Sequence, residues 1–179
     1  GGSGQSSSAE IYTSSADGGS ILLYCLGPMT LTGGSNLNSS AKIRTSCVTG
    51  DNDITINASS LTLQGGALAG FQSATAEITT ESGDIIIGNT IRGEISLVGG
   101  SGTNDIAVIS PGDGNDVSIR SNSIELMGGS GNGAYAAIKT ADGGDLNLNI
   151  EEGGLFLFGG TNAGADAFID IDGTSSIVV

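Results

Sequence analysis

The sequence predicts an all-β fold, a parallel β-helix with three short strands in each coil. Three features predict it together: motifs that repeat about every 31 residues, alternation of apolar and variable residues within each repeat, and turn residues between these runs. Three short strands cannot bury their apolar faces alone, whereas stacked repeats bury them continuously. We therefore expect residues 1–179 to form one β-solenoid domain of roughly five and a half coils.

The first repeated element is L-x-L-x-G-G, a strand that ends in a glycine pair. The first glycines of successive pairs lie 32, 34, 29 and 31 residues apart. The pair indicates a corner that needs either a positive φ or a close approach of two backbones. A phosphate-binding loop is disfavoured, because no lysine and no helix follow the pairs. The five copies are MTLTGG (29–34), LTLQGG (61–66), ISLVGG (95–100), IELMGG (124–129) and LFLFGG (155–160).

The second element is a strand that starts with alanine and has isoleucine two positions later. Six residues separate each glycine pair from this alanine, except in segment 67–75, which has nine. The spacing also holds for GGSGQSSSAEIYT at residues 1–13, so this linker-like stretch is expected to be part of a coil. The alanines form an inward column of small side chains, and each starts a repeat. They are Ala9, Ala41, Ala76, Ala107, Ala136 and Ala167.

The third element is a short apolar strand that follows a serine or an aspartate. Such a residue at a corner commonly forms a hydrogen bond with its own backbone, and this is the interpretation we favour. The corner residues are Ser20, Asp53, Asp84, Asp116, Asp145 and Ser176.

A calcium site is the alternative for this corner. Four stacked carboxylates, Asp53, Asp84, Asp116 and Asp145, would repel one another unless a cation bound them, and Ca²⁺ prefers carboxylate oxygens. Two glycine-rich segments, GDGND (112–116) and GGSGTND (99–105), also partly match a calcium-binding nonapeptide. The nine-residue period of that motif is absent, so calcium stays the less favoured alternative and no other cofactor is expected.

An apolar stripe is predicted on the outward positions of the L-x-L strands. Val98, Met127, Phe156 and Phe158 would lie on the surface, and exposed apolar patches usually mark contacts. We expect an assembly surface there, the alternative being a neighbouring loop that covers it. The longer segment 67–75 carries Phe71 and is expected either to protrude as a binding loop or to pack as a flap.

Two further outward columns lie on the alanine-led strands. Glu10, Lys42 and Glu77 alternate in charge along one column, and Tyr12 lies against Arg44 in the next. Ion pairs between neighbouring coils and a cation–π contact are therefore expected.

The two cysteines, Cys25 and Cys47, fall in the first two coils but at different corners. A disulfide requires Cα atoms within about 7 Å, so a bridge and two separate thiols both stay open.

Composition excludes several classes of function. The net charge is −14, from 19 acidic and 5 basic residues, which argues against binding nucleic acid or anionic membranes. No apolar run is long enough for a transmembrane helix, so membrane insertion is not expected. The chain has no histidine, which excludes histidine-based triads and metal sites, and no carboxylate pair stands out. We therefore expect a protein that is not an enzyme.

The repeat pattern resembles that of filamentous-haemagglutinin-like exoproteins, which are large bacterial surface and secreted proteins. Segments AEITTESGDIII (76–87) and AAIKTADGGDLNL (136–148) carry the resemblance best, and it covers nearly the whole chain. It implies a right-handed β-helix, export to the cell surface or extracellular space, and an adhesive or fibre role.

Both ends of the predicted solenoid are expected to be open. The chain begins at a Gly-Gly corner and stops one turn and one L-x-L strand short of closing its last coil, with no polar cap at either end. Open strand edges pair readily with another chain. The chain is therefore expected to be either a stretch of a longer β-helix or a unit that stacks end to end. The expected function is a structural or adhesive fibre module that stacks head to tail with itself, with host or matrix glycans or proteins as further partners. The alternative is a carbohydrate-binding or polysaccharide-processing β-helix.

Overall fold

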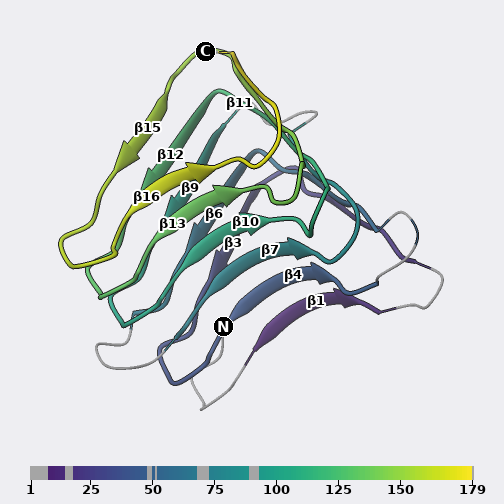
Figure 1. Ribbon diagram of the computed structural model, residues 1–179. Coiled ribbons are helices and arrows are strands. Elements are labelled where there is room, and N and C mark those ends of the chain that lie inside the picture. The colour runs from purple at the N-terminus through teal and green to yellow at the C-terminus, as the bar shows by residue number, and fades with distance from the viewer. Residues whose placement is uncertain are drawn as a thin grey trace.

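In the computed structural model, the chain winds into a β-solenoid whose three parallel sheets run along its length (Figure 1). The structure describes residues 8–14, 18–47, 50, 52–67, 73–88 and 93–178, and all regular elements among them are strands. Register partners in neighbouring coils lie 29 to 35 residues apart. The predicted all-β fold with three strands in each coil is therefore confirmed.

Each sheet collects one of the three sequence elements. Sheet A contains the alanine-led strands β1 (Ala9–Thr13), β4 (Ala41–Thr45), β7 (Ala76–Thr80), β10 (Ala107–Ser110), β13 (Ala136–Lys139) and β16 (Ala167–Asp170). Sheet B contains β2 (Ile21–Tyr24), β5 (Ile54–Asn57), β8 (Ile85–Ile87), β11 (Val117–Ser121), β14 (Leu146–Ile150) and β17 (Ser175–Val178). Sheet C contains β3 (Pro28–Thr32), β6 (Ser60–Gln64), β9 (Glu94–Val98), β12 (Ser123–Met127) and β15 (Leu155–Phe158).

The core consists of stacked columns of like residues. The alanines that start sheet A pair with one another in register, and so do the isoleucines two positions later. These side chains are fully buried in the middle coils, as are the inward leucines and isoleucines of sheets B and C. Period-2 alternation therefore places one face of every strand inside, as the sequence predicts.

The last coil departs from the predicted register. Strand β17 pairs Leu146 with Ser175 and Leu148 with Ile177, so Thr174 occupies the corner that we assigned to Ser176. The two registers differ by two residues and keep the same side chains inside, so alternation alone does not distinguish them.

The glycine pairs are explained by close backbone approach. A Cβ at Gly128 would lie closer than 3.0 Å to Ala165 O and Gly160 N of the next coil, and no positive φ is found at either residue of its pair. Four residues after the second glycine, the corner does adopt a positive φ. Asn38, Asn104, Gly133 and Gly164 hold that position, and all are residue types that tolerate it.

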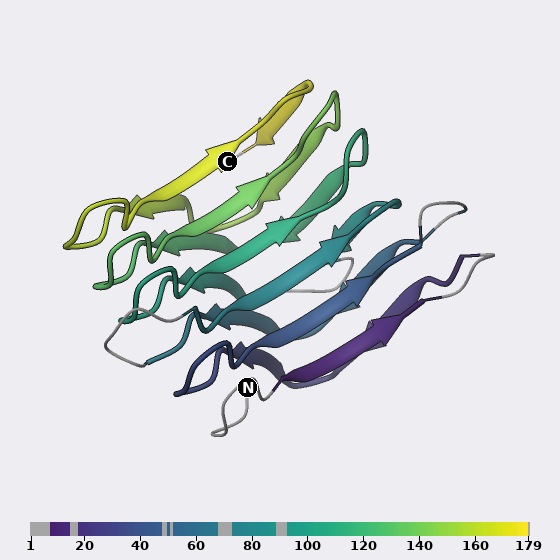
Figure 2. The same cartoon turned by 60° about the horizontal axis from the view of Figure 1, so that its bottom comes forward.

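The two ends of the stack differ in the strands that they expose. Figure 2 shows the coils stacked from β1 at one end to β16 and β17 at the other. Sheets A and B have six strands each and sheet C has five, so the last coil contributes no strand to sheet C within the described chain. The described residues also include no helix that is long and apolar enough to cross a membrane.

Candidate functional site

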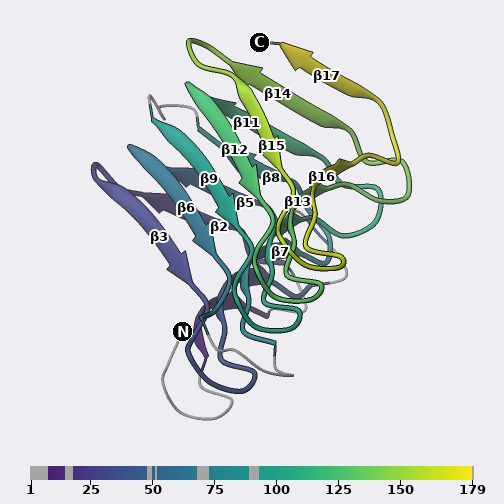
Figure 3. The same cartoon turned by 90° about the vertical axis from the view of Figure 1, so that its left-hand side faces the viewer.

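The predicted apolar stripe forms on the outward face of sheet C, whose strands are labelled in Figure 3. Val98, Met127 and Phe158 are register partners on β9, β12 and β15. Phe156 lies next to Phe158, with ring centroids 6.4 Å apart and planes nearly parallel. Met127 and both phenylalanines are exposed to solvent. The fifth predicted contact residue, Phe71, lies outside the described residues.

A groove of about 440 Å³ runs along the solenoid beside this stripe, at the corner between sheets C and A. Stacked glycine pairs, such as Gly99–Gly100 and Gly128–Gly129, line its floor. One wall has an amide and apolar side chains, and the other has hydroxyl groups. The first wall is lined by Gln64, Val98, Met127 and Phe158, and the second by Ser101, Ser130 and Thr161.

The groove follows directly from the corner chemistry. The glycines have no side chains and their backbones pack against the adjacent coils, so the corner is a trough between the end of sheet C and the loop that leads to sheet A. Among the described residues, no charged side chain lines it, although the chain carries a net charge of −14. From the described lining, an occupant would therefore meet hydroxyl, amide, backbone and apolar groups. The sequence predicted the stripe but not the opposite hydroxyl wall.

The aspartate column forms a hydrogen-bond ladder along the corner between sheets A and B. Oδ1 of Asp53 accepts the backbone N–H of Asp84 at 2.9 Å, and Oδ1 of Asp84 accepts that of Asp116 at 2.9 Å. Asp116 and Asp145 accept the N–H groups of Asp145 and Thr174, each at 2.8 Å. The corner residues thus bind the backbone of the next coil rather than their own turn.

This ladder gives each carboxylate a structural partner. The hydrogen bonds from the Thr174 side chain and backbone hold the pKa of Asp145 below its usual value. Among the residues that the structure describes, no group of three or more acidic, cysteine or histidine side chains is placed to hold a metal ion. The weaker alternative, a calcium column at these positions, has no further support from the geometry.

The second calcium-like segment, residues 99–105, contains a buried carboxylate. Asp105 accepts the backbone N–H groups of Ala74 at 2.7 Å and Gly102 at 2.8 Å. Burial is the main influence on its pKa and raises it, against the lowering effect of these two hydrogen bonds. The role of Asp105 was not predicted from the sequence. The equivalent position in the next coil is Ala134, and an acidic residue in place of this small apolar one was a signal of a special role.

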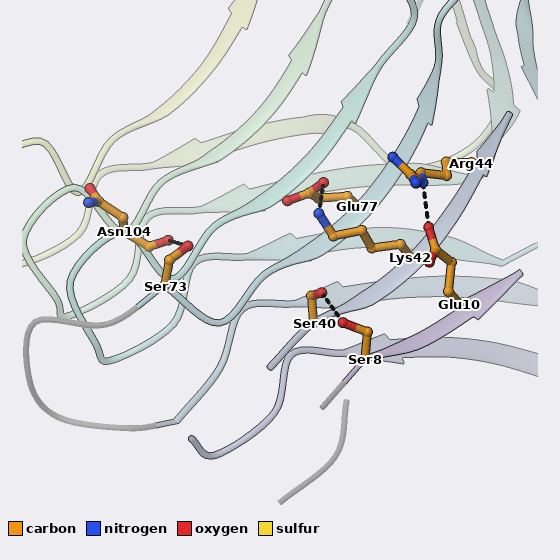
Figure 4. Close-up of polar contacts among 8 residues, drawn as sticks. All are labelled: Ser8, Glu10, Ser40, Lys42, Arg44, Ser73, Glu77 and Asn104. Carbon is orange, nitrogen blue, oxygen red and sulfur yellow. Dashed lines mark hydrogen bonds and ion pairs between the residues drawn. The ribbon is translucent and has the colours of Figure 1, made fainter. Parts of the chain in front are cut away.

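The outward face of sheet A carries the predicted ion pairs, with one change of partner. Lys42 Nζ lies 2.9 Å from Glu77 Oε2, and the Arg44 guanidinium lies 4.5 Å from the Tyr12 ring centroid, both as predicted. Glu10, however, pairs with Arg44 rather than with its register partner Lys42 (Figure 4). These contacts connect the first three coils and account for all five side chains as structural.

Cys25 and Cys47 lie at different corners, as expected. Cys25 follows β2 and is half-buried, whereas Cys47 follows β4 and is buried, and no disulfide joins them in this structure. We assign neither residue to a binding surface.

The two ends of the solenoid expose residues that are buried in the middle coils. Ile11 at the N-terminal end is 47% exposed, and Leu157 and Ile177 at the C-terminal end are 41% and 43% exposed. Their column partners Ile78, Leu126 and Leu148 are fully buried. At the N-terminal end a mainly apolar hollow of about 540 Å³ opens between β1, β3 and β4, and Glu10 and Lys42 are also among its lining residues.

The three stacked parallel sheets define the class of protein, a β-solenoid of the β-helix type. No family model, curated protein or solved structure matches the chain. The function is therefore argued from the surfaces of the chain itself.

Proposed function

We propose that the chain is a non-enzymatic structural module that stacks end to end with copies of itself into a fibre. The observation that carries the proposal is the exposure of core columns at both ends, together with the strand edges there. Among the described residues, β1, β2 and β3 are paired on one side only at the first end, and β15, β16 and β17 at the other. Such edges offer backbone donors and acceptors to another chain.

The two ends have matching columns. If β1 of one copy continues sheet A beyond β16 of another, Ala9 follows Ala167 and Ile11 follows Ile169, as in every internal step. In sheet B, Leu23 follows Ile177. The joint would then bury the apolar side chains that each end exposes, which is the main driving force for such association.

At the corner between sheets A and B, the two ends of the solenoid place no carboxylates against each other in this joint. The aspartate ladder ends in hydroxyl residues at both ends, Ser20 and Thr174. Stacking therefore brings two neutral side chains together at this corner instead of two carboxylates, whose repulsion would oppose association.

Sedimentation velocity over a range of concentrations, with negative-stain electron microscopy, tests the proposal. We expect the wild type to form filaments as its concentration rises and Ile11→Asp to remain monomeric, because it places a charge in the joint. Leu22→Asp is the matched control, since Leu22 lies on the same end but points outward and is exposed. A wild type that stays monomeric at every concentration would show the proposal to be wrong.

We also propose that the module acts at the cell surface or outside the cell, in an adhesive or fibre-forming protein of the filamentous-haemagglutinin-like kind. Support comes from the repeat pattern of segments 76–87 and 136–148 and from the β-solenoid that these segments build. Immunolabelling of intact cells of the source organism, compared with permeabilised cells, tests the location.

The groove favours a second candidate function, binding of a neutral glycan chain. A sugar chain presents hydroxyl groups at its edges and C–H groups on its faces, and the two walls of the groove offer hydroxyl and apolar groups in the same way. Titration calorimetry with a neutral β-linked hexasaccharide tests it. Phe158→Ser should weaken binding, whereas Tyr24→Ser, an exposed aromatic on sheet B, should not. Equal binding to both variants, or none to the wild type, would exclude this site.

A further inference from the structure

The corner between sheets A and B contains an aspartate-glycine turn in three consecutive coils of the described chain. In such a turn the backbone nitrogen of the glycine can attack the side-chain carboxyl of the aspartate, because glycine has no side chain that hinders the approach. The attack isomerises the aspartate, and the three turns differ in how far the structure permits it. They are Asp113–Gly114, Asp142–Gly143 and Asp172–Gly173.

The first of these turns holds its nitrogen in a hydrogen bond. Gly114 donates its N–H to Ala141 O of the next coil at 2.9 Å. The nitrogen must give up this bond before it attacks the carboxyl of Asp113, and an unpaired backbone group is costly. The first turn is therefore protected.

The third turn has an occupied carboxylate and a closely packed glycine. Oδ2 of Asp172 accepts the backbone N–H of Asp142 at 3.0 Å. A Cβ at Gly173 would lie closer than 3.0 Å to Gly144 O in the preceding coil, so the backbone there has little room to rearrange. Ring closure at Asp172 is opposed on both counts.

The middle turn leaves its nitrogen free. Gly144 donates its N–H to Ala141 O at 3.1 Å and closes the turn. The two central residues have positive φ, 48° at Asp142 and 93° at Gly143, as in a type I′ turn. Among the described residues no acceptor binds the Gly143 N–H, and a Cβ built on Gly143 meets nothing within 4 Å. The nucleophile and the space for a ring are both available beside the exposed Asp142.

The neighbouring carboxylates also favour reaction at the middle turn. Attack requires the protonated carboxyl, because its hydroxyl group leaves. Asp113 and Asp172 face Asp142 from the coils on either side. Repulsion by Asp113 and a hydrogen bond with it raise the pKa of Asp142 above its usual value, and repulsion by Asp172 adds a smaller part. Asp142 therefore keeps its proton to a higher pH than an isolated aspartate does.

We propose that Asp142 is a site of spontaneous isomerisation to isoaspartate, with the nitrogen of Gly143 as nucleophile and solvent water as the only co-reactant. The nitrogen bonds to Cγ of Asp142, and the carboxyl hydroxyl leaves with the proton of the nitrogen as one water molecule. A second water molecule then opens the resulting succinimide ring. Opening at Cγ restores aspartate, whereas opening at the main-chain carbonyl leaves the chain linked through Cγ and frees an α-carboxylate.

Peptide mapping of the aged protein tests the site. The chain is kept near pH 5, about one unit above the usual pKa of aspartate, and is then digested with trypsin. Trypsin separates Asp113, in peptide 93–120, from Asp142 and Asp172, in peptide 140–179, and electron-transfer fragmentation locates isoaspartate within each. We expect isoaspartate to accumulate at Asp142 at least fivefold faster than at the other two positions.

The same chain unfolded in urea is the reference, because all three pairs should react at similar rates there. Equal rates at the three positions of the folded chain would overturn the proposal. An excess at Asp142 that is just as large in urea would overturn the structural cause, since it would belong to the local sequence. Asp142→Glu keeps the carboxyl but needs a larger ring, and it should abolish the modification at this position.

A pH comparison tests the part played by the neighbouring carboxyl. Asp113→Ser should slow isomerisation of Asp142 at least twofold near pH 5 and leave it unchanged near pH 3, where Asp142 is protonated in both proteins. Asp166→Ser removes the same charge from an exposed position at another corner and should have no effect at either pH. Circular dichroism checks the fold of each variant. Equal slowing by Asp113→Ser at both pH values would overturn this role of Asp113, because it would then act on the shape of the turn.

Discussion

At the scale of single residues, contacts with the neighbouring coil explain why particular residue types recur in this chain. The Asp84 carboxylate accepts an amide of Asp116, and Gly128 leaves room for the backbone at Ala165. Neither contact joins residues that are close in sequence. Residue types therefore recur with the period of the coil, because each coil presents the same neighbour to the next.

The glycine pairs provide the first residue-scale prediction. Gly128→Ala should destabilise the fold by about 1–3 kcal/mol, because its Cβ would overlap backbone atoms of the next coil. Gly159→Ala should have almost no effect on the monomer, since the space beyond it is open. Urea unfolding monitored by circular dichroism at low protein concentration measures both. Equal destabilisation by the two substitutions would contradict the explanation by close approach.

Asp105 provides a prediction for pH dependence. Burial raises the pKa of this carboxyl above its usual value, so the folded chain takes up the proton at a higher pH than the unfolded chain does. Its contribution to stability therefore increases as the pH falls from neutral toward 4. We expect the free energy of unfolding of the wild type, relative to Asp105→Asn, to rise over this range.

Urea titrations of both proteins at several pH values measure this difference, with Asp166→Asn as a control. Asp166 lies at the corner between sheets C and A, as Asp105 does, but it is exposed. A wild-type advantage that falls on acidification would contradict the assignment.

At the scale of strands, the sequence predicted which residues face inward but not every register. Alternation with a period of two assigns faces, and motif spacing brings equivalent strands together, so all three sheets were predictable. Strand β17 was not, because a shift of two residues preserves its inward face. The diagonal pair of Glu10 with Arg44 was also missed, since side-chain length rather than register selects that partner.

The candidate surfaces were predictable only where they lie on strands, because alternation assigns the faces of strands and not the paths of loops. The outward stripe from Val98 to Phe158 follows from alternation within strands. The hydroxyl wall opposite it depends on the path of the corner loop, which alternation does not describe. The burial of Asp105 likewise depends on how that loop folds back on the glycine pair.

The alanine column of sheet A provides a prediction for packing between strands. Ala107 is fully buried between Ala76 and Ala136, so a larger side chain has no space to enter. Ala107→Leu should therefore destabilise the fold by about 1–3 kcal/mol. Ala9→Leu, in the exposed first strand, is the matched control and should cost less. Urea unfolding measures both, and equal losses would show that the column is not sterically limited.

The aromatic residues of β15 provide a second element-scale prediction. Phe156→Ser combined with Phe158→Ser should leave the monomer folded, because both rings are exposed, and should remove side-by-side association of filaments through the stripe. Electron microscopy distinguishes single filaments from bundles, and circular dichroism monitors the fold. Loss of folding in the double variant would instead show that the rings belong to the core.

At the scale of the whole molecule, net charge opposes the association that the apolar ends favour. Each copy carries −14, and stacking places these charges a few coil spacings of about 4.8 Å apart. The Debye length is about 10 Å at 0.1 M salt, so added salt screens repulsion between copies while leaving the burial of Ile11 and Leu157 intact.

Salt should therefore promote end-to-end assembly. We expect the concentration at which filaments appear to fall several-fold between 0.01 M and 0.5 M sodium chloride, because the joint is apolar and each copy carries a net negative charge. Light scattering over a dilution series at each salt concentration measures it. Ile11→Asp under the same conditions is the control for non-specific salting-out. Filaments that dissolve as salt increases would mean that ion pairs hold the joint, which its neutral corner and apolar columns do not provide.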